Sequence, residues 1–190
     1  VFTVVSVMLY VPFDDLVGRR LSENAWLSGL LLVPAIWFVF IKNKSWWLVN
    51  QKGSIKLWLI VLSVTALLMF LGDFSLKFLP LLPAYFLWAG FQQTLMVSLF
   101  QWLKKSTALN RKGTDWFLLV FVAACFAVLH MPNHYLMVLT FASGLFWIYI
   151  WCKYENLLLM VLSHSLWALL LYQVAGEAWL YSARVGSGFL

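Results

Sequence analysis

Four polar side chains that could exchange a proton or form hydrogen bonds with a reacting group lie inside long apolar segments of this sequence: Gln92, Gln93, His130 and His164. An imidazole takes up and releases a proton near neutral pH, and a glutamine amide both donates and accepts hydrogen bonds. Such groups are costly to bury in an apolar segment unless they have partners or a function. We therefore interpret the four residues as candidates for a catalytic or binding site.

The composition predicts a helical membrane protein. Hydrophobic residues make up 64% of the 190 residues and charged residues 11%, whereas about 25% of the residues in soluble domains are charged. Several apolar runs approach the roughly 20 residues with which a helix crosses a bilayer. The runs are continuous and lack the alternation of a membrane β-strand. We therefore predict an all-α, polytopic transmembrane helical bundle that forms a single domain over residues 1–190.

The apolar runs predict six full membrane spans after a partial N-terminal helix at residues 1–13. The expected spans cover residues 25–41, 57–72, 78–103, 116–131, 135–152 and 156–173. The glutamine pair then lies on the third span, His130 on the fourth and His164 on the sixth. A helix rises about 1.5 Å per residue, so all four side chains reach the middle or outer half of the membrane. This common depth favours one shared site within the membrane.

Lys and Arg residues are concentrated in alternate loops of this arrangement. Nine of the 13 follow the first, third and fifth spans, at residues 42–56, 104–112 and Lys153. Because basic residues are retained on the cytoplasmic side of a membrane, we place these loops in the cytoplasm and the C-terminus outside. The net charge of +6 then reflects membrane topology. We expect the lipid bilayer as the surroundings and no nucleic-acid partner.

The residues around the two histidines also fit two motifs of a known family. Phe126 and His130 form the pattern Phe-x-x-x-His. His164 begins the pattern His-x-x-x-Asn/Asp, in which Ala168 takes the last position. Over residues 79–172 the sequence resembles the CAAX-protease and bacteriocin-processing family (CPBP, or Abi, family) of intramembrane endopeptidases.

The family's first motif, Glu-Glu-x-x-x-Arg, is altered in this sequence. Gln92 and Gln93 take the positions of the two glutamates, and Val97 takes that of the arginine. A carboxylate can take a proton from water, whereas an amide oxygen is far too weakly basic to do so. The two glutamines can still position a water molecule or donate hydrogen bonds to an oxyanion. His130 or His164 is then left as the base.

The resemblance implies an intramembrane endopeptidase, a hydrolase that acts on membrane-associated peptides or proteins in the bacterial inner membrane. The candidate catalytic residues that it implies are His130, His164, Gln92 and Gln93, with Phe126 and Asn133 in secondary roles. No cofactor follows from the resemblance.

Two other interpretations remain open. The altered first motif also fits a non-catalytic family member, or pseudoenzyme, that binds a membrane partner protein on the same scaffold. His130 and His164 are, in addition, possible axial ligands of a haem or another metal. A structural zinc site would usually require four nitrogen or sulfur ligands, and only these two histidines lie at depth in the predicted spans.

Reporter fusions test the predicted orientation. A fusion in the loop at Asn50 should read as cytoplasmic, and fusions after Asp73 or at the C-terminus should read as external, because the lysine-rich loops stay inside. The measurement is the activity ratio of paired alkaline phosphatase and green fluorescent protein reporters at each position. The reverse pattern would contradict the orientation but not the grouping of the polar side chains.

Overall fold

Helices joined by short turns make up the part of the chain that the structure describes. The computed structural model describes residues 55–106 and 116–180, except for the side chains of Ala84 and residues 176–178. The elements in these ranges are α4 (Ile55–Leu71), the 3-10 helix η2 (Leu79–Leu81), α5 (Leu82–Ser106), α6 (Trp116–Val128), α7 (His134–Tyr154) and α8 (Leu157–Leu180). The all-α class is therefore confirmed. The expected helix at residues 1–13 and the expected span at 25–41 lie outside the described residues.

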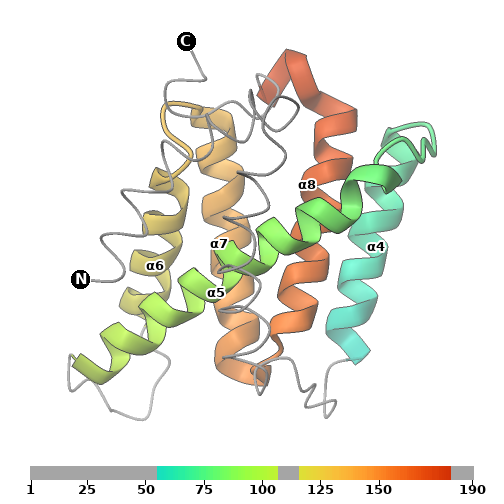
Figure 1. Cartoon of the computed structure of the whole chain (residues 1–190). Coiled ribbons are helices and arrows are strands. Elements are labelled where there is room, and N and C mark those ends of the chain that lie inside the picture. Colours follow the sequence, from blue (N-terminus) through green and yellow to red (C-terminus); the bar gives the residue numbers. More distant parts are fainter. Residues whose placement is uncertain (1–54, 107–115, 181–190) are drawn as a thin grey trace, which may run out of the picture.

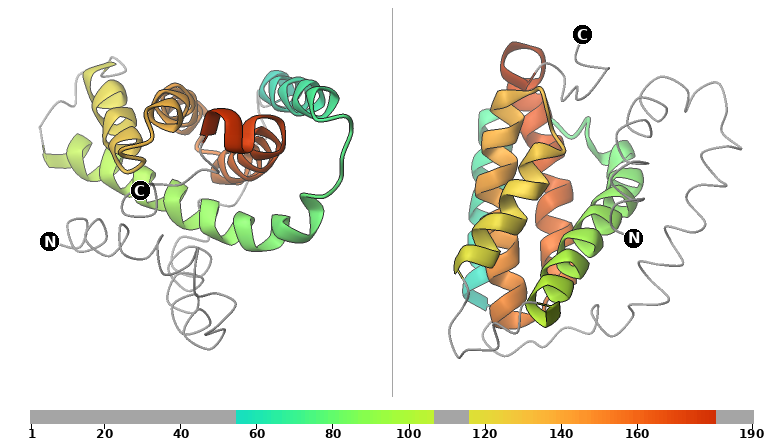
Figure 2. Two further views of the ribbon diagram at one scale, coloured as in Figure 1. Left: turned by 90° about the horizontal axis from the view of Figure 1, so that it is seen from above. Right: turned by 90° about the vertical axis from the view of Figure 1, so that its left-hand side faces the viewer.

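Four of the described helices stand side by side, and α5 crosses them obliquely. In Figure 1, α6, α7, α8 and α4 form a row, and α5 runs diagonally across it. The view from above in Figure 2 places α5 along one face of this row. Helix α5 contacts α6, α7 and α8, and α8 also contacts α4 and α7. The crossing brings together segments that are far apart in the sequence.

Two prolines mark the start of α5. Pro80 lies within η2, and Pro83 is the second residue of α5. The first N–H groups of a helix have no partner inside the helix, so a proline costs no hydrogen bond there. The helix then continues for 25 residues and carries Gln92 and Gln93 near its middle.

The expected fourth span is shorter than predicted. Helix α6 ends at Val128 and not at residue 131, because Pro132 disfavours the helical conformation at Met131 and its ring would clash with the Val128 carbonyl in a continuing helix. The backbone tightens into a turn in which the His130 N–H donates to the Ala127 carbonyl at 2.9 Å. His130 therefore lies in the turn between α6 and α7, which corrects its predicted place within the helix.

Two of the described helices are long and apolar enough to cross a membrane: α7, and α8 over Leu157–Ala175. Helices α4 and α6 are apolar but have 17 and 13 residues, fewer than the roughly 20 that span a bilayer. Helix α5 is long enough with 25 residues, but it is less apolar because of its glutamine pair and its two terminal lysines. Six full spans thus remain a prediction.

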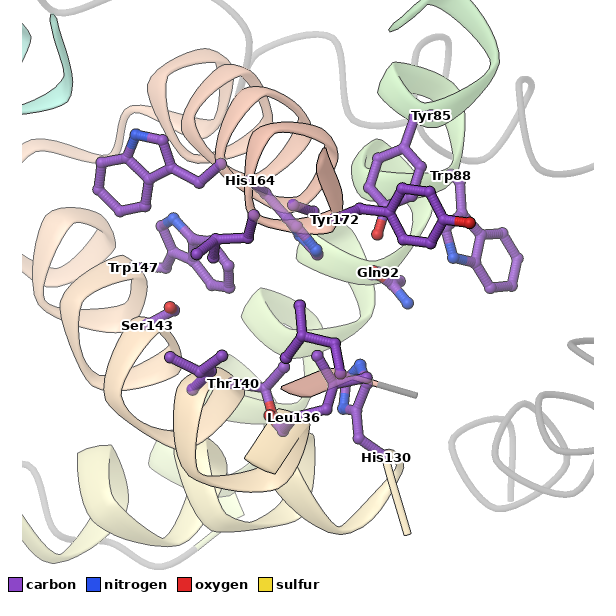
Figure 3. Close-up of a pocket in the computed structure, with 15 residues that line it drawn as sticks. Tyr85, Trp88, Gln92, His130, Leu136, Thr140, Ser143, Trp147, His164 and Tyr172 are labelled. Carbon is purple, nitrogen blue, oxygen red and sulfur yellow. The ribbon is translucent and has the colours of Figure 1, made fainter. Parts of the chain in front are cut away.

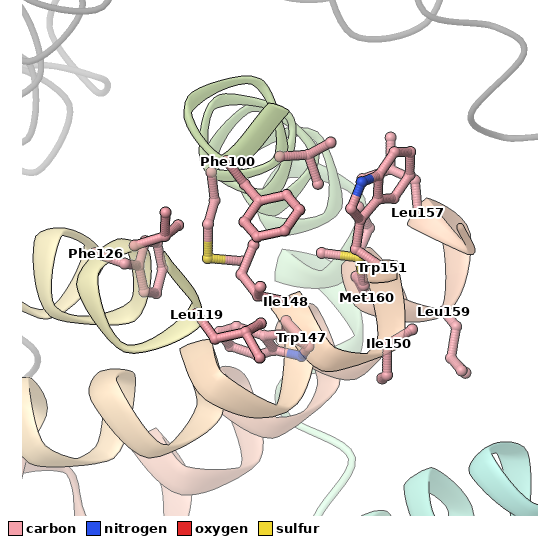
Figure 4. Close-up of a cluster of buried hydrophobic side chains, with 14 of the residues drawn as sticks. Phe100, Leu119, Phe126, Trp147, Ile148, Ile150, Trp151, Leu157, Leu159 and Met160 are labelled. Carbon is pink, nitrogen blue, oxygen red and sulfur yellow. The ribbon is translucent and has the colours of Figure 1, made fainter. Parts of the chain in front are cut away.

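The main apolar core lies where α5, α6, α7 and α8 meet (Figure 4). Each of these helices contributes fully buried side chains, among them Val97, Leu119, Ile148 and Met160. A second, smaller cluster joins α4 to α8 and includes Leu68 and Leu170. The helices that carry the candidate site residues therefore share one packed core.

Helices α6 and α7 approach each other closely at Gly144. A Cβ atom placed on Gly144 would lie 3.3 Å from both the Cα and the Cβ atom of Ala123. Small residues at such positions let the backbones of membrane helices come together. This contact holds α6, and with it the turn that carries His130, against the bundle.

Enlarging Gly144 should therefore destabilise the bundle. We expect Gly144→Val to lower the free energy of unfolding by about 1–3 kcal/mol, the usual effect of overpacking, because the new side chain pushes Ala123 away. Thermal unfolding in detergent, followed by tryptophan fluorescence, measures the effect. Ala142→Val is the matched control, since Ala142 is exposed on the same helix. Equal unfolding temperatures for the two variants would contradict the close contact.

Candidate functional site

Polar side chains from three separate parts of the fold line one cavity of about 250 Å³. Gln92 comes from α5, His130 from the turn after α6, and His164 from α8 (Figure 3). The complete lining is Tyr85, Trp88, Gln92, His130, Leu136, Leu139, Thr140, Ser143, Trp147, His164, Trp167, Ala168, Leu171, Tyr172 and Leu180. The fourth candidate, Gln93, is fully buried outside this lining and contacts His164.

His130 is oriented by a carbonyl group that the end of α6 leaves open. In a continuing helix the Phe126 carbonyl would accept the N–H of residue 130, but this N–H bonds Ala127. The His130 Nδ1 takes its place, 2.9 Å from the Phe126 oxygen. A carbonyl oxygen only accepts hydrogen bonds, so Nδ1 carries the proton and Nε2 of the neutral ring keeps its lone pair. His130 is thus prepared to accept a proton at Nε2.

His164 is held by one hydrogen bond and by three aromatic rings. Its Nδ1 lies 2.9 Å from the Gln93 amide nitrogen. The Trp147 ring stacks on the imidazole at 4.5 Å with an interplanar angle of 24°, and the rings of Phe126 and Tyr85 meet it edge-on at 5.9 and 6.1 Å. Because these contacts surround the imidazole, its plane has little freedom to rotate.

Phe126 contacts both imidazoles. Its ring centroid lies 5.1 Å from that of His130 and 5.9 Å from that of His164. The sum of these distances, about 11 Å, is the upper limit for the separation of the two imidazoles. Phe126 does not line the cavity itself, so it meets the site only through these contacts with the two histidines.

Asn133 lies outside the cavity lining and joins two helices. Its Oδ1 accepts the N–H of Leu136 at 3.1 Å, which caps the start of α7. Its Nδ2 donates to the carbonyl of Leu180 at 2.7 Å. Leu180 is the last residue of α8 and part of the cavity wall. Asn133 therefore holds one wall of the cavity in place, although it is fully buried away from it.

Sequence reasoning missed most of the cavity wall. On α7, the lining residues Leu136, Thr140, Ser143 and Trp147 follow one another at intervals of four, three and four residues. This spacing is that of one face of a helix. The polar residues along this face are a signal from which the wall could have been predicted. The stacking of Trp147 on His164 depends on how α7 and α8 pack and left no such signal.

The arrangement offers no evident metal centre. The described residues contain no group of three or more His, Cys, Asp or Glu side chains that could hold a metal ion. A haem with two axial histidines would need a lone pair from each ring. His130 can offer the one on Nε2, whereas the Nδ1 of His164 is occupied by Gln93.

Comparison with known protein families found one match for this chain. Residues 77–170 match the family described as type II CAAX prenyl endopeptidase, Rce1-like. This range includes the glutamine pair, the turn with His130 and the helix with His164. No curated protein and no solved structure matches the chain.

Removing the Asn133 side chain should loosen the cavity wall. We expect Asn133→Ala to lower the free energy of unfolding by about 1–3 kcal/mol, because it removes a helix cap and a buried hydrogen bond. Asn133→Asp keeps the cap but loses the donor to Leu180, so its effect should be attributable to α8. Thermal unfolding measures both. His134→Ala is the control, since His134 is the exposed next residue, and an equal effect there would refute the role of Asn133.

Proposed function

Because the chain belongs to the CAAX-protease (CPBP) family, we propose that it is an integral membrane endopeptidase that cleaves membrane-associated peptides or proteins. The observation that carries the proposal is the orientation of His130. Its Nε2 lone pair is the basic group that a hydrolase needs, and it belongs to a side chain that shares a cavity with His164 and Gln92.

In the proposed reaction, His130 is the general base. Its Nε2 takes a proton from a water molecule as the water oxygen attacks the scissile carbonyl carbon. The carbonyl becomes an oxyanion, which the side chains of His164 and Gln92 stabilise by donating hydrogen bonds. The protonated His130 then delivers its proton to the leaving amine nitrogen, and the peptide bond breaks. The cavity of about 250 Å³ is large enough for a peptide group and a water, which occupies about 30 Å³.

This route differs from the one that the family motif implies. No Asp or Glu is found among the described residues that line the cavity, so none of these residues supplies a carboxylate to share the work of the base. Ala168 also faces the cavity, where the family pattern has a polar Asn or Asp. Activity would therefore depend on His130 alone for proton transfer.

The lack of a carboxylate among the described lining residues and the presence of Ala168 also favour a second candidate function. A cavity whose described lining has no carboxylate and includes Ala168 is also suited to holding a membrane peptide without cleaving it. On this alternative the chain is a non-catalytic scaffold for a partner protein. The remaining parts of the proposal are common to both: six membrane spans, an external C-terminus and a place in the bacterial inner membrane.

Histidine variants separate the enzyme from the scaffold. If the chain is an enzyme, His130→Ala should reduce cleavage about 10²–10⁴-fold, the usual effect of losing a general base, and His164→Ala should also reduce it. The assay uses the full chain in lipid nanodiscs and a fluorescence-quenched prenylated peptide that ends in a CAAX sequence. His134→Ala is the control, because His134 is exposed and outside the cavity lining.

Three outcomes are informative. Cleavage that falls in both cavity variants but not in the control supports the enzyme. Wild-type cleavage that survives both substitutions overturns the mechanism. A wild-type chain that cleaves nothing, while the His130 and His164 variants change its stability or its capture of a membrane peptide, supports the scaffold.

A further inference from the structure

The two buried imidazoles have partners of opposite character. The Nδ1 of His130 faces the Phe126 carbonyl, which can only accept a hydrogen bond. The Nδ1 of His164 faces the Gln93 amide nitrogen at 2.9 Å, which can only donate one. A neutral imidazole has one N–H and one lone pair, so each partner determines which nitrogen carries the proton. The two rings are therefore held in opposite tautomers.

The direction of the Gln93 amide follows from what its other atom meets. With its nitrogen on His164, Gln93 leaves its buried Oε1 without a hydrogen-bond partner among the described residues. In the reverse orientation, Oε1 would face His164, and the amide N–H groups would be buried without a hydrogen-bond partner among the described residues. Unpaired buried N–H groups are rarer in proteins than unpaired carbonyl oxygens. The orientation with the nitrogen on Nδ1 is therefore the favoured one.

We propose that Gln93 is a positioning residue that keeps the proton of His164 on Nε2 and so makes this ring a hydrogen-bond donor to the cavity. Gln93 lies outside the lining, whereas His164 is part of it. The His164 ring reaches into the cavity in Figure 3, beside Gln92 and across from His130. With Nδ1 bound to Gln93, Nε2 is the nitrogen that remains for a ligand.

This assignment gives the two histidines different tasks. His130 offers a lone pair and His164 offers an N–H, so the cavity contains one acceptor and one donor on rings of the same kind. For cleavage, which rests on the proposed function, the donor is the group that meets the oxyanion. A proton on the wrong nitrogen of His164 would place a lone pair against the developing negative charge.

The proposal also explains why an amide suits position 93. A carboxylate only accepts hydrogen bonds, so an ionised glutamate there would draw the proton of His164 to Nδ1 and remove the donor from Nε2. Gln92 and Gln93 are neighbours but have separate surroundings, since only Gln92 lines the cavity. The two substitutions in the family's first motif therefore differ in their consequences.

Nitrogen NMR tests the tautomers directly. The chain contains three histidines, at positions 130, 134 and 164, so full chain labelled with ¹⁵N-histidine in nanodiscs gives three sets of ring signals. Nitrogens with and without a proton differ strongly in ¹⁵N chemical shift. His134→Gln identifies the signals of the exposed ring and His130→Gln those of His130, so the remaining set belongs to His164. We expect the proton on Nε2 in His164 and on Nδ1 in His130, which serves as the internal reference. A proton on Nδ1 of His164 in the wild-type chain overturns the proposal.

Matched substitutions test the role of Gln93. Gln93→Met removes the donor at nearly constant length, so the His164 signals should change from one tautomer to a mixture. Gln92→Met makes the same change one residue earlier and should leave His164 with its proton on Nε2. A Gln93→Met chain that keeps the pure Nε2–H form would show that something else sets the tautomer, and the proposal would be wrong.

Cleavage assays connect the tautomer to activity. Where the wild-type chain cleaves the prenylated peptide, Gln93→Met should lower kcat by up to about 10²-fold, the effect of losing one oxyanion donor, with little change in KM. A tautomer that shifts without any change in kcat overturns the role of Gln93 in the reaction. A wild-type chain that cleaves nothing refutes the proposed function, while the NMR result still decides the assignment of the tautomer.

Discussion

The candidate site depends on how the chain leaves α6 ahead of Pro132. Because a proline disfavours the helical conformation of the residue before it, and its ring would clash with the carbonyl four residues earlier, α6 ends at Val128. The His130 N–H then bonds Ala127, which leaves the Phe126 carbonyl for the His130 side chain. Through this hydrogen bond, the Phe126 carbonyl determines the position, the ring plane and the tautomer of His130. The turn that results leads directly to Asn133, which starts α7 and binds the end of α8. A buried polar group that must find a partner thus organises both the site and its wall.

The helical class and the grouping of polar side chains could be predicted from the sequence. Long apolar runs must satisfy their backbone hydrogen bonds internally, which makes them helices. Polar side chains within them must face inward, and Gln92, His130 and His164 do share one cavity. The oblique path of α5 could not be predicted, because it depends on the packing of side chains from several helices. The stacking of Trp147 on His164 follows from that packing and could not be predicted from the sequence either.

The predicted end of the fourth span was wrong for a local reason. Hydropathy continues through Met131, and only the backbone chemistry of Pro132 ends the helix earlier. The separate surroundings of Gln92 and Gln93 have a simpler origin. Successive residues on a helix point about 100° apart, so one amide reaches the cavity and the other reaches His164. A motif of two adjacent identical residues conceals this difference.

The departures from the family motif fit together as a set. Val97, which takes the place of the arginine, is fully buried in the apolar core. An arginine there would be a buried cation without the carboxylate that the family motif supplies, and such a charge is strongly unfavourable. With amides at positions 92 and 93, an arginine at position 97 would have no carboxylate there to pair with. The apolar side chain of Val97 fills the space instead.

The cavity lining also has an electrical consequence. None of the described residues around it is Asp, Glu, Lys or Arg. Its two histidines are neutral, with the proton on Nδ1 in His130 and on Nε2 in His164. A transmembrane voltage acts on net charge, at about 2.3 kcal/mol per elementary charge for 100 mV across the whole membrane. The field therefore has almost no charge to act on among the described residues of the lining. Binding of an uncharged segment in this cavity should therefore proceed alike in energised and de-energised membranes.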